Sequence, residues 1–287
     1  MPPQTTTPDP PTFNLSALNT ALAATPFAGH LHHLASTSST NDLAAQAALA
    51  GSRTGVWIAD HQLAGRGRGR HTWHSPAGSG LYMTALTAPP IAMQSAPAIS
   101  LRVAIAVQSA IASLYGFARP HQIDIRWPND LLLNRRKVGG ILIDTASNPA
   151  TATHPATLRY AIVGIGINLN QASFPPDLEP IATSIRRELS TQSIENSTNC
   201  PREPLAAAIL LALEQELHDL TQTPAPTPLD LAPYSTWITN KRVRVEPREG
   251  LPVYTGTTAG LNPAGFLLVQ GDDGQLHTVL SGGLREP

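Results

Sequence analysis

The chain has 287 residues, which is long enough for a main domain and a smaller one. Its formal net charge is −1 and its sequence pI is about 6.8. A near-neutral charge argues against DNA, RNA or an anionic membrane as the main partner, because phosphate binding normally brings net basicity. We find no apolar run near the ~20 residues of a membrane-spanning helix, and a single cysteine cannot form an internal disulfide, so we expect a cytoplasmic protein.

The first 222 residues predict a mixture of strands and helices. Residues 1–13 are rich in Pro and Thr and should be disordered, without the features of a secretory signal. We then expect, in chain order, a short helix at 15–24, a strand at 30–35, an alanine-rich helix at 41–50, and strands at 56–61 and 81–87. A long buried helix at 97–115 should follow, then strands at 123–127, 131–133, 138–145 and 160–169, and an amphipathic helix at 203–221.

The last part of the chain has a different character. A Pro-rich break at 223–233 precedes four short apolar runs separated by Gly, Asn, Asp and Pro, at 241–245, 253–259, 265–269 and 276–280. Several strands in so short a stretch favour a small barrel. The predicted organisation is a disordered start at 1–13, a main domain at 14–222, a linker at 223–236 and a small β domain at 237–287.

A glycine–arginine segment between two predicted strands is the first candidate for chemistry. It reads Gly65-Arg66-Gly67-Arg68-Gly69-Arg70 and is closed by Trp73. Glycines let a backbone approach a ligand, and guanidinium groups bind carboxylate and phosphate in a forked geometry. The alternatives are a solvated basic loop or a nucleic-acid-binding tail, but such a tail repeats for longer. We expect an anionic ligand.

A second candidate is Arg126-Trp127-Pro128-Asn129-Asp130, followed by Lys137 and then Gly139-Gly140. A carboxylate at a tight turn can hold Mg²⁺ or a lysine ammonium. Lys137 is notable because only it and Lys241 are lysines, so arginine supplies nearly all of the positive charge. Taken alone, this segment is an ordinary turn with an ordinary hairpin charge.

Two further segments carry weaker signals. The motif at 163–170, which overlaps the strand predicted at 160–169, contains Gly164, Gly166 and Asn168, but no helix follows at the spacing of a dinucleotide-binding fold. Asn168 could face a nucleotide or cap a turn. The run Ser38-Ser39-Thr40-Asn41 is either a helix N-cap or a set of small hydrogen-bonding groups on a pocket wall.

The four segments together resemble the biotin–protein ligase family in type, order and separation, from about His32 to the C-terminus. The resemblance implies an α+β fold: a mixed sheet with helices, of the class II synthetase and biotin–lipoate ligase kind, plus a small C-terminal SH3-like β-barrel. The chain begins close to the Ser-Thr-Asn motif, so we expect the enzyme-only form without a winged-helix DNA-binding domain. Arg70 stands one residue early relative to the family loop, which leaves its role open.

Members of this family use ATP to convert biotin to biotinyl-5′-AMP, and then form a C–N bond to a lysine of a biotin carboxyl carrier domain. The resemblance therefore implies a biotin–[acetyl-CoA-carboxylase] ligase that uses biotin, ATP and Mg²⁺. Its partner would be the carrier domain of an acetyl-CoA or acyl-CoA carboxylase, with no DNA and no membrane as partner.

The resemblance also implies roles for individual residues. The ureido group of biotin would be bound by Ser39, Thr40 and Gln62. Its carboxylate and the α-phosphate would be covered by Arg66, Gly67 and Arg68 and bridged by Lys137, the main electrostatic catalyst. Arg68, Trp73, Asn129, Asp130 and Asn168 would lie on the ATP side. Asp130 would orient Lys137, act with Lys137 and Arg66 in catalysis, and be the candidate contact for Mg²⁺.

Three alternatives stay open. A lipoate–protein ligase shares this fold and chemistry but generally lacks the glycine–arginine segment at 65–70, here called the Arg-Gly loop. A non-catalytic biotin-binding regulator is disfavoured by the presence of Lys137 and Asp130. A metal site is suggested by a cluster of histidines whose spacing fits no zinc signature that we recognise, and strand or loop histidines are the simpler interpretation: His30, His32, His33, His61, His71 and His74.

Overall fold

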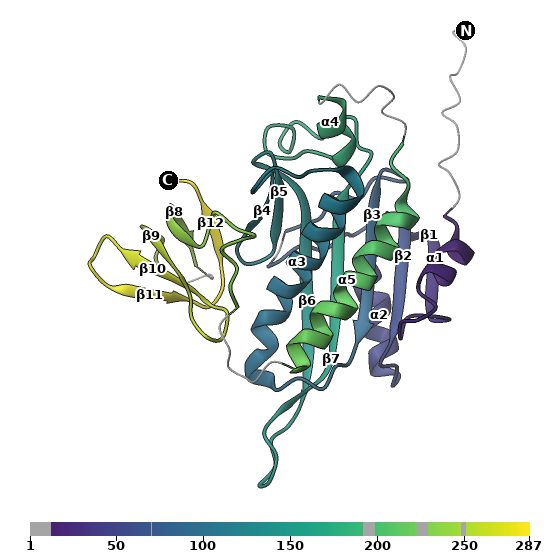
Figure 1. Cartoon of the computed structure of the whole chain (residues 1–287), viewed down its shortest axis with the longest axis horizontal. Coiled ribbons are helices and arrows are strands. Elements are labelled where there is room, and N and C mark those ends of the chain that lie inside the picture. Colours follow the sequence, from purple (N-terminus) through teal and green to yellow (C-terminus); the bar gives the residue numbers. More distant parts are fainter. Residues whose placement is uncertain (1–12, 70, 192–198, 223–228, 248–250) are drawn as a thin grey trace.

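The computed structural model describes residues 13–69, 71–191, 199–222, 229–247 and 251–287 (Figure 1). The predicted disorder of residues 1–12, the role of Arg70 and most of the Pro-rich break lie outside the described residues. Phe13, which we expected to be disordered, is instead buried, with 5% of its surface exposed.

A seven-stranded sheet forms the centre of the main part of the chain, in the order β1-β2-β3-β7-β6-β5-β4. The strands β1 and β2 are parallel and all other neighbours are antiparallel, which confirms the predicted mixed sheet. The strands are β1 (Leu31–Thr37), β2 (Gly55–Gln62), β3 (Gly80–Thr87), β4 (Ile123–Arg126), β5 (Asp130–Leu133), β6 (Arg136–Asn148) and β7 (Thr157–Asn168).

Helices cover both faces of this sheet. The helices are α1 (Leu15–Ala21), α2 (Thr40–Leu49), η1 (Met93–Ser95), α3 (Ala96–Tyr115), α4 (Ile185–Ser190) and α5 (Arg202–Gln222). In Figure 1, α3 and α5 lie side by side on one face and α2 lies behind the other. Strand β7 alternates accordingly: Val163 and Ile165 join the core that contains α3 and α5, whereas Ile162 packs with Ala44 of α2.

Helix α3 corrects one expectation. Together with η1, it spans Met93–Tyr115 and contains an 18-residue window with a mean hydropathy of 1.5, so it is long and apolar enough to cross a membrane by composition. The expectation that the chain contains no such apolar run was therefore wrong. In the structure α3 packs against α5 and the sheet, and this position in the core accounts for its apolar character. It ends at Gly116, whose φ is +69°.

The C-terminal part forms a second, antiparallel sheet in the order β11-β10-β9-β8-β12. Its strands are β8 (Thr239–Glu246), β9 (Tyr254–Leu261), β10 (Leu267–Gly271), β11 (Leu276–Val279) and β12 (Gly283–Arg285). We predicted neither β12 nor α4. The two sheets touch where the Trp127 indole donates a hydrogen bond of 3.3 Å to the Gly265 carbonyl, so the second sheet lies against the end of β4.

The segment just before β8 is attached to the main sheet. The Ile125 N–H of β4 donates to the Tyr234 carbonyl at 3.1 Å, and the Ser235 hydroxyl donates to the Ile125 carbonyl at 2.6 Å. The Thr236 N–H donates to the Asp124 carboxylate at 2.9 Å. Residues 234–236, which we predicted as part of a linker, therefore run along β4 in fixed positions.

Candidate functional site

Glycines shape the face of the sheet that carries α2. Because side chains alternate along a strand, Gly164, Gly166 and Asn168 share the face of Ile162. Gly140 on β6 pairs with Gly166. A Cβ at Gly166 would lie 2.5 Å from Trp73 Nε1, and one at Gly140 would lie 3.2 Å from Trp73 Cζ3. The glycines thus allow the Trp73 indole to lie directly on the sheet.

A cavity of about 1440 Å³ opens over this glycine floor. It is bounded by α2, the Arg-Gly loop, the β5–β6 hairpin and parts of the C-terminal sheet. All eleven residues that we proposed from the sequence line this one cavity, although they come from distant parts of the chain: Ser39, Thr40, Gln62, Arg66, Gly67, Arg68, Trp73, Asn129, Asp130, Lys137 and Asn168.

One wall of the cavity is a hydrogen-bonded group at the start of α2. Gln62 Oε1 accepts from the Thr40 N–H at 2.9 Å and lies 3.1 Å from its hydroxyl, and Gln62 Nε2 donates to Ser75 at 3.1 Å. The buried Thr84 hydroxyl lies 2.7 Å from Thr40 Oγ1. Ser39 is at the N-cap position, and no capping hydrogen bond from its side chain is present. This wall offers both donors and acceptors in fixed places.

Two buried donors on the cavity have no hydrogen-bond partner within the described residues. They are Asn41 Nδ2 beside this wall and Trp73 Nε1 on the floor. A buried donor without an acceptor costs about 1–3 kcal/mol. A ligand that brings acceptors into the cavity would remove that cost. The sequence places Asn41 in the run that is either an N-cap or a pocket wall, but it predicts no specific ligand contact for this residue.

Lys137 and Asp130 form the charged centre of the site. Lys137 Nζ lies 2.6 Å from Asp130 Oδ1, and Arg126 Nη2 lies 2.6 Å from Asp130 Oδ2. Burial works to raise the pKa of Asp130, but the charges and hydrogen bonds of Lys137 and Arg126 outweigh it, so that this pKa lies below its ordinary value. Asp130 is thus an ionised carboxylate shared by two cations. The sequence motif contains Arg126 but predicts no separate role for it.

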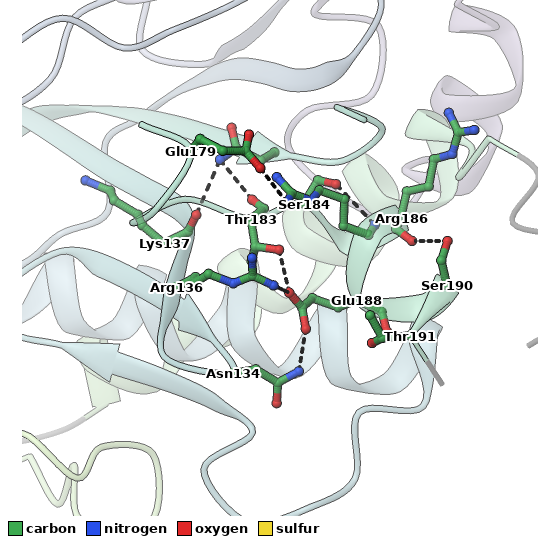
Figure 2. A network of polar contacts seen from close by, with 12 residues as sticks. Asn134, Arg136, Lys137, Glu179, Thr183, Ser184, Arg186, Glu188, Ser190 and Thr191 are labelled. Carbon is green, nitrogen blue, oxygen red and sulfur yellow. Dashed lines mark hydrogen bonds and ion pairs between the residues drawn. The ribbon is translucent and has the colours of Figure 1, made fainter. Parts of the chain in front are cut away.

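The backbone of Lys137 is held from behind by the segment that leads into α4. Lys137 N–H donates to the Ile181 carbonyl at 2.8 Å, and the Thr183 N–H donates to the Lys137 carbonyl at 2.9 Å. In Figure 2, the Glu188 carboxylate of α4 accepts hydrogen bonds from Arg136, Asn134 and the Thr183 hydroxyl. This network around the buried Glu188 carboxylate fixes the turn from which Lys137 projects.

The Arg-Gly loop folds into a small hairpin over the cavity. Gly67 N–H donates to the His71 carbonyl at 2.8 Å, and Trp73 N–H donates to the Gly65 carbonyl at 2.8 Å. Arg66 Nη1 lies 2.8 Å from Asp42 and its Nη2 lies 3.7 Å from Asp144. In this structure, therefore, the Gly67 amide and the Arg66 guanidinium are engaged by the protein itself.

Arg68 and the two proposed asparagines tie neighbouring segments together. Arg68 donates to the Gly282 carbonyl at 3.1 Å and to Asn129 Oδ1 at 3.4 Å. Asn129 Nδ2 donates to the Ile141 carbonyl at 2.8 Å. Asn168 Nδ2 donates to the Thr183 carbonyl at 3.1 Å. Both asparagines thus line the cavity while their amides bond the backbone of adjacent segments.

The chain's only other lysine also lines the cavity. Lys241, on β8, places Nζ 2.9 Å from Glu286 and 4.9 Å from the centre of the Trp237 ring. Lysine is rare in the sequence, but no sequence motif predicts a role for Lys241. Among the described residues, no group of three or more His, Cys, Asp or Glu side chains could hold a metal ion.

Comparisons with known proteins agree over both parts of the chain. Residues 34–168 match the family described as the biotin/lipoate A/B protein ligase family, and residues 238–282 match the biotin protein ligase C-terminal domain. The bifunctional ligase/repressor BirA of Bacillus subtilis (strain 168) is 34% identical over 221 residues, which are 76% of this chain and 62% of that protein. A biotin–[acetyl-CoA-carboxylase] ligase of Paracoccus denitrificans is 36% identical over 151 residues, covering 52% of this chain and 59% of that protein.

The chain therefore spans about 62% of the length of the first curated relatives that it matches. Among solved structures, a biotin protein ligase from Aquifex aeolicus in complex with biotin and ATP aligns with a TM-score of 0.68, at 22% identity over 90% of this chain and 100% of that one. This likeness confirms the predicted fold class.

Proposed function

The chain belongs to the biotin/lipoate A/B protein ligase family, and on that premise we propose that it activates biotin with ATP and transfers it to a protein lysine. The product of the first step is biotinyl-5′-AMP, and the acceptor is the biotin carboxyl carrier domain of an acyl-CoA carboxylase. The reaction takes place in the cytoplasm, as the composition predicts.

The observation that carries this proposal is the pairing of a neutral polar wall with a cationic centre in one cavity. The group around Thr40 and Gln62 suits a ureido ring, because a buried neutral polar group needs both donors and acceptors. The Lys137 ammonium, held by Asp130, suits the carboxylate at the other end of biotin. A lipoyl group has no ureido ring, so this wall favours biotin over lipoate.

The first step joins two anions, and the site must offset their repulsion. A biotin carboxylate oxygen attacks the α-phosphorus of ATP, an acyl–phosphate bond forms, and pyrophosphate leaves. We assign Lys137 to the space between the carboxylate and the α-phosphate, where its charge stabilises the transition state. Arg66 and Arg68 close the loop over the product, with Gly67 giving the backbone room.

On the nucleotide side, we assign Trp73 to the adenine, and Asn129 and Asn168 to the walls that hold the nucleotide in register. In the second step the acceptor's lysine amine attacks the acyl carbon and AMP leaves. The protein supplies no nucleophile for this step. Its part is to shield the mixed anhydride from water until the acceptor arrives.

The residues around Asp130 do not fit a protein-held Mg²⁺. Both carboxylate oxygens of Asp130 are already bound by cationic side chains, Lys137 on one and Arg126 on the other. A divalent cation prefers several free oxygen ligands. We therefore derive no step through Asp130-bound metal, and leave Mg²⁺ to the phosphates of ATP.

The test is a transfer reaction with the purified chain. Biotin, ATP, Mg²⁺ and a biotin carrier domain should give a biotinylated carrier on a streptavidin blot, with release of pyrophosphate, and lipoate in place of biotin should give neither. Lys137→Ala should slow adenylate formation by about 100-fold, as expected for loss of one transition-state donor. Arg242→Ala, which removes an exposed cation outside the cavity, is the matched control. Transfer of lipoate, or full activity of Lys137→Ala, would overturn the proposal.

A further inference from the structure

Trp237 is held in a fixed position beside the catalytic half of the molecule. The three residues before it are hydrogen-bonded to β4, and the Gln108 side chain of α3 also donates to the Tyr234 carbonyl at 3.2 Å. The Trp237 side chain is buried, and the backbone N–H of Trp237 donates to the Ser235 hydroxyl at 3.1 Å. Its indole therefore has a defined place next to the end of β4.

Two cations lie over the Trp237 ring. The Arg126 guanidinium carbon is 5.6 Å from the ring centre and Lys241 Nζ is 4.9 Å from it. The negative π face of an aromatic ring attracts cations, and this attraction strengthens where water is excluded. Arg126 is well shielded, with 16% of its side chain exposed. The ring thus gives the Arg126 side chain a preferred position.

Arg126 connects that ring to the charged centre. Its Nη2 atom lies 2.6 Å from Asp130 Oδ2, while Asp130 Oδ1 lies 2.6 Å from Lys137 Nζ. The four side chains form a continuous series of contacts, which we call the Trp237 relay: Trp237, Arg126, Asp130 and Lys137. Without Arg126, one oxygen of Asp130 would be unpaired, and the carboxylate would be free to rotate away from Lys137.

We propose that Trp237 and Arg126 are positioning residues for Lys137, so that the C-terminal part of the chain sets the place of the catalytic ammonium through the Trp237 relay. This inference rests on the proposed function. It assigns to the segment that leads into β8 a part in the chemistry, beyond covering the cavity. Neither residue touches the reacting atoms in this scheme, since both act through Asp130.

Steady-state and pH measurements of biotin-dependent pyrophosphate exchange test the relay. Arg126→Gln should lower kcat by about tenfold or more and leave the KM for biotin within about twofold, because it disturbs Lys137 and not the hydrogen-bonded wall around Thr40 and Gln62. The acid limb of the pH profile should move to higher pH, since Arg126 helps to hold the pKa of Asp130 down against burial. Arg126→Lys, which keeps a positive charge, should return the acid limb most of the way to its wild-type position.

The Trp237 variants test the first contact of the relay. Trp237→Leu should change kcat and the acid limb in the same direction as Arg126→Gln, by about threefold in rate. Trp237→Tyr, which keeps an aromatic ring, should retain most of the rate. In the Arg126→Gln background, Trp237→Leu should have no further effect, because residues of one contact network are not additive. If the double variant instead lost kcat by the product of the two single-variant factors, the two residues would act independently and the inference would be overturned.

An NMR measurement that does not depend on enzyme activity distinguishes this inference from the proposed function. With ¹³C-labelled lysine, the chain gives signals from only two lysine side chains, and Lys241→Arg assigns them. Arg126→Gln and Trp237→Leu should both change the chemical shift of the Lys137 side chain. An inactive wild-type protein whose Lys137 signal responds in this way would refute the function but keep the relay. If Trp237→Leu does not fold by circular dichroism, Trp237→Tyr and Trp237→Phe replace it, with a displacement that grows from Tyr to Phe. An unmoved Lys137 signal would overturn the relay.

Discussion

Asp130 shows how one carboxylate can serve two cations in a shielded site. Its ionised form is required by Lys137 and Arg126, each of which lies 2.6 Å from one of its oxygens. Removing one member of a buried ion pair is costly because the remaining charge stays desolvated. Both the stability of the fold and the position of Lys137 in the site therefore depend on an ionised Asp130.

This dependence gives a prediction for stability against pH. The folded-state pKa of Asp130 is depressed, so its contribution is fully present above the unfolded value of about 3.9 and is lost as the pH falls through the lower folded value. At pH 7, Asp130→Asn should lower the free energy of unfolding by about 3 kcal/mol, because two cations lose their partner. In urea unfolding, the difference from wild type should shrink as the pH falls below about 4.

The control is Asp272→Asn, which removes the partner of Arg242 at an exposed position of the C-terminal sheet. Its effect on the free energy of unfolding at neutral pH should be much smaller, because water screens that pair. A stability difference for Asp130→Asn that stays constant across this pH range would contradict the argument.

At the scale of the element, β7 combines a core face with a ligand-facing floor. Its alternation places Ile165 and Ile167 against the core of α3 and α5, and places Gly164 and Gly166 under the cavity. The glycines are needed because Asn41 and Trp73 lie where side chains would otherwise be. One face of β7 thus stabilises the core, and the other face leaves room for the side chains at the floor of the cavity.

Gly166→Ala should disturb the site more than the fold. The added Cβ would lie 2.5 Å from Trp73 Nε1, so the indole must move off the floor. We expect a free energy of unfolding lower by about 1–3 kcal/mol and a loss of nucleotide affinity of about tenfold or more, measured by urea unfolding and by calorimetry with ATP. Gly283→Ala, where a Cβ meets nothing within 4 Å, is the matched control for stability. Wild-type ATP affinity in Gly166→Ala would remove Trp73 from its proposed role.

Much of this element-level architecture could be predicted from local patterns. The β-branched run of β7, the apolar spacing of α3 and the turn at Asn129 each carry a signal within a few residues. The gathering of Ser39, the Arg-Gly loop and Lys137 around one cavity was inferred through resemblance, since no local pattern gives distances between such remote segments.

Other features could not be predicted because their cause lies in tertiary contacts. Helix α4 has only six residues, too few for a clear apolar periodicity. Its Glu188 is buried only because Asn134 and Arg136, more than fifty positions earlier, meet it. The attachment of residues 234–236 to β4 uses Ser, Thr and backbone groups, which in the sequence resemble any loop.

At the scale of the whole molecule, one continuous core joins the two sheets. Val243 and Leu267 of the C-terminal sheet belong to the same buried cluster as Ile125 of β4 and Leu101 of α3. Trp127, buried between the two parts, donates its indole hydrogen bond across them. The two sheets therefore share apolar surface and are not connected by a hinge alone.

We accordingly predict a single cooperative unfolding transition. In a variant that carries Trp57→Phe and Trp73→Phe, tryptophan fluorescence reports only on Trp127 and Trp237 at the junction, and it should change at the same urea concentration as the far-UV circular dichroism of the helices. Two separated transitions, with the fluorescence change first, would show that the C-terminal sheet detaches before the main sheet unfolds.

The confinement of both lysines to one cavity has a consequence for a chain proposed to make an activated acid. Biotinyl-5′-AMP acylates amines, and an enzyme that releases some of it risks modifying its own surface. Here the surface charge comes from arginine, which does not react in this way, while Lys137 and Lys241 are each engaged by a carboxylate. The chain therefore offers a leaking acyl donor very few side-chain amines, and acylation of its own lysine side chains should be confined to the cavity walls.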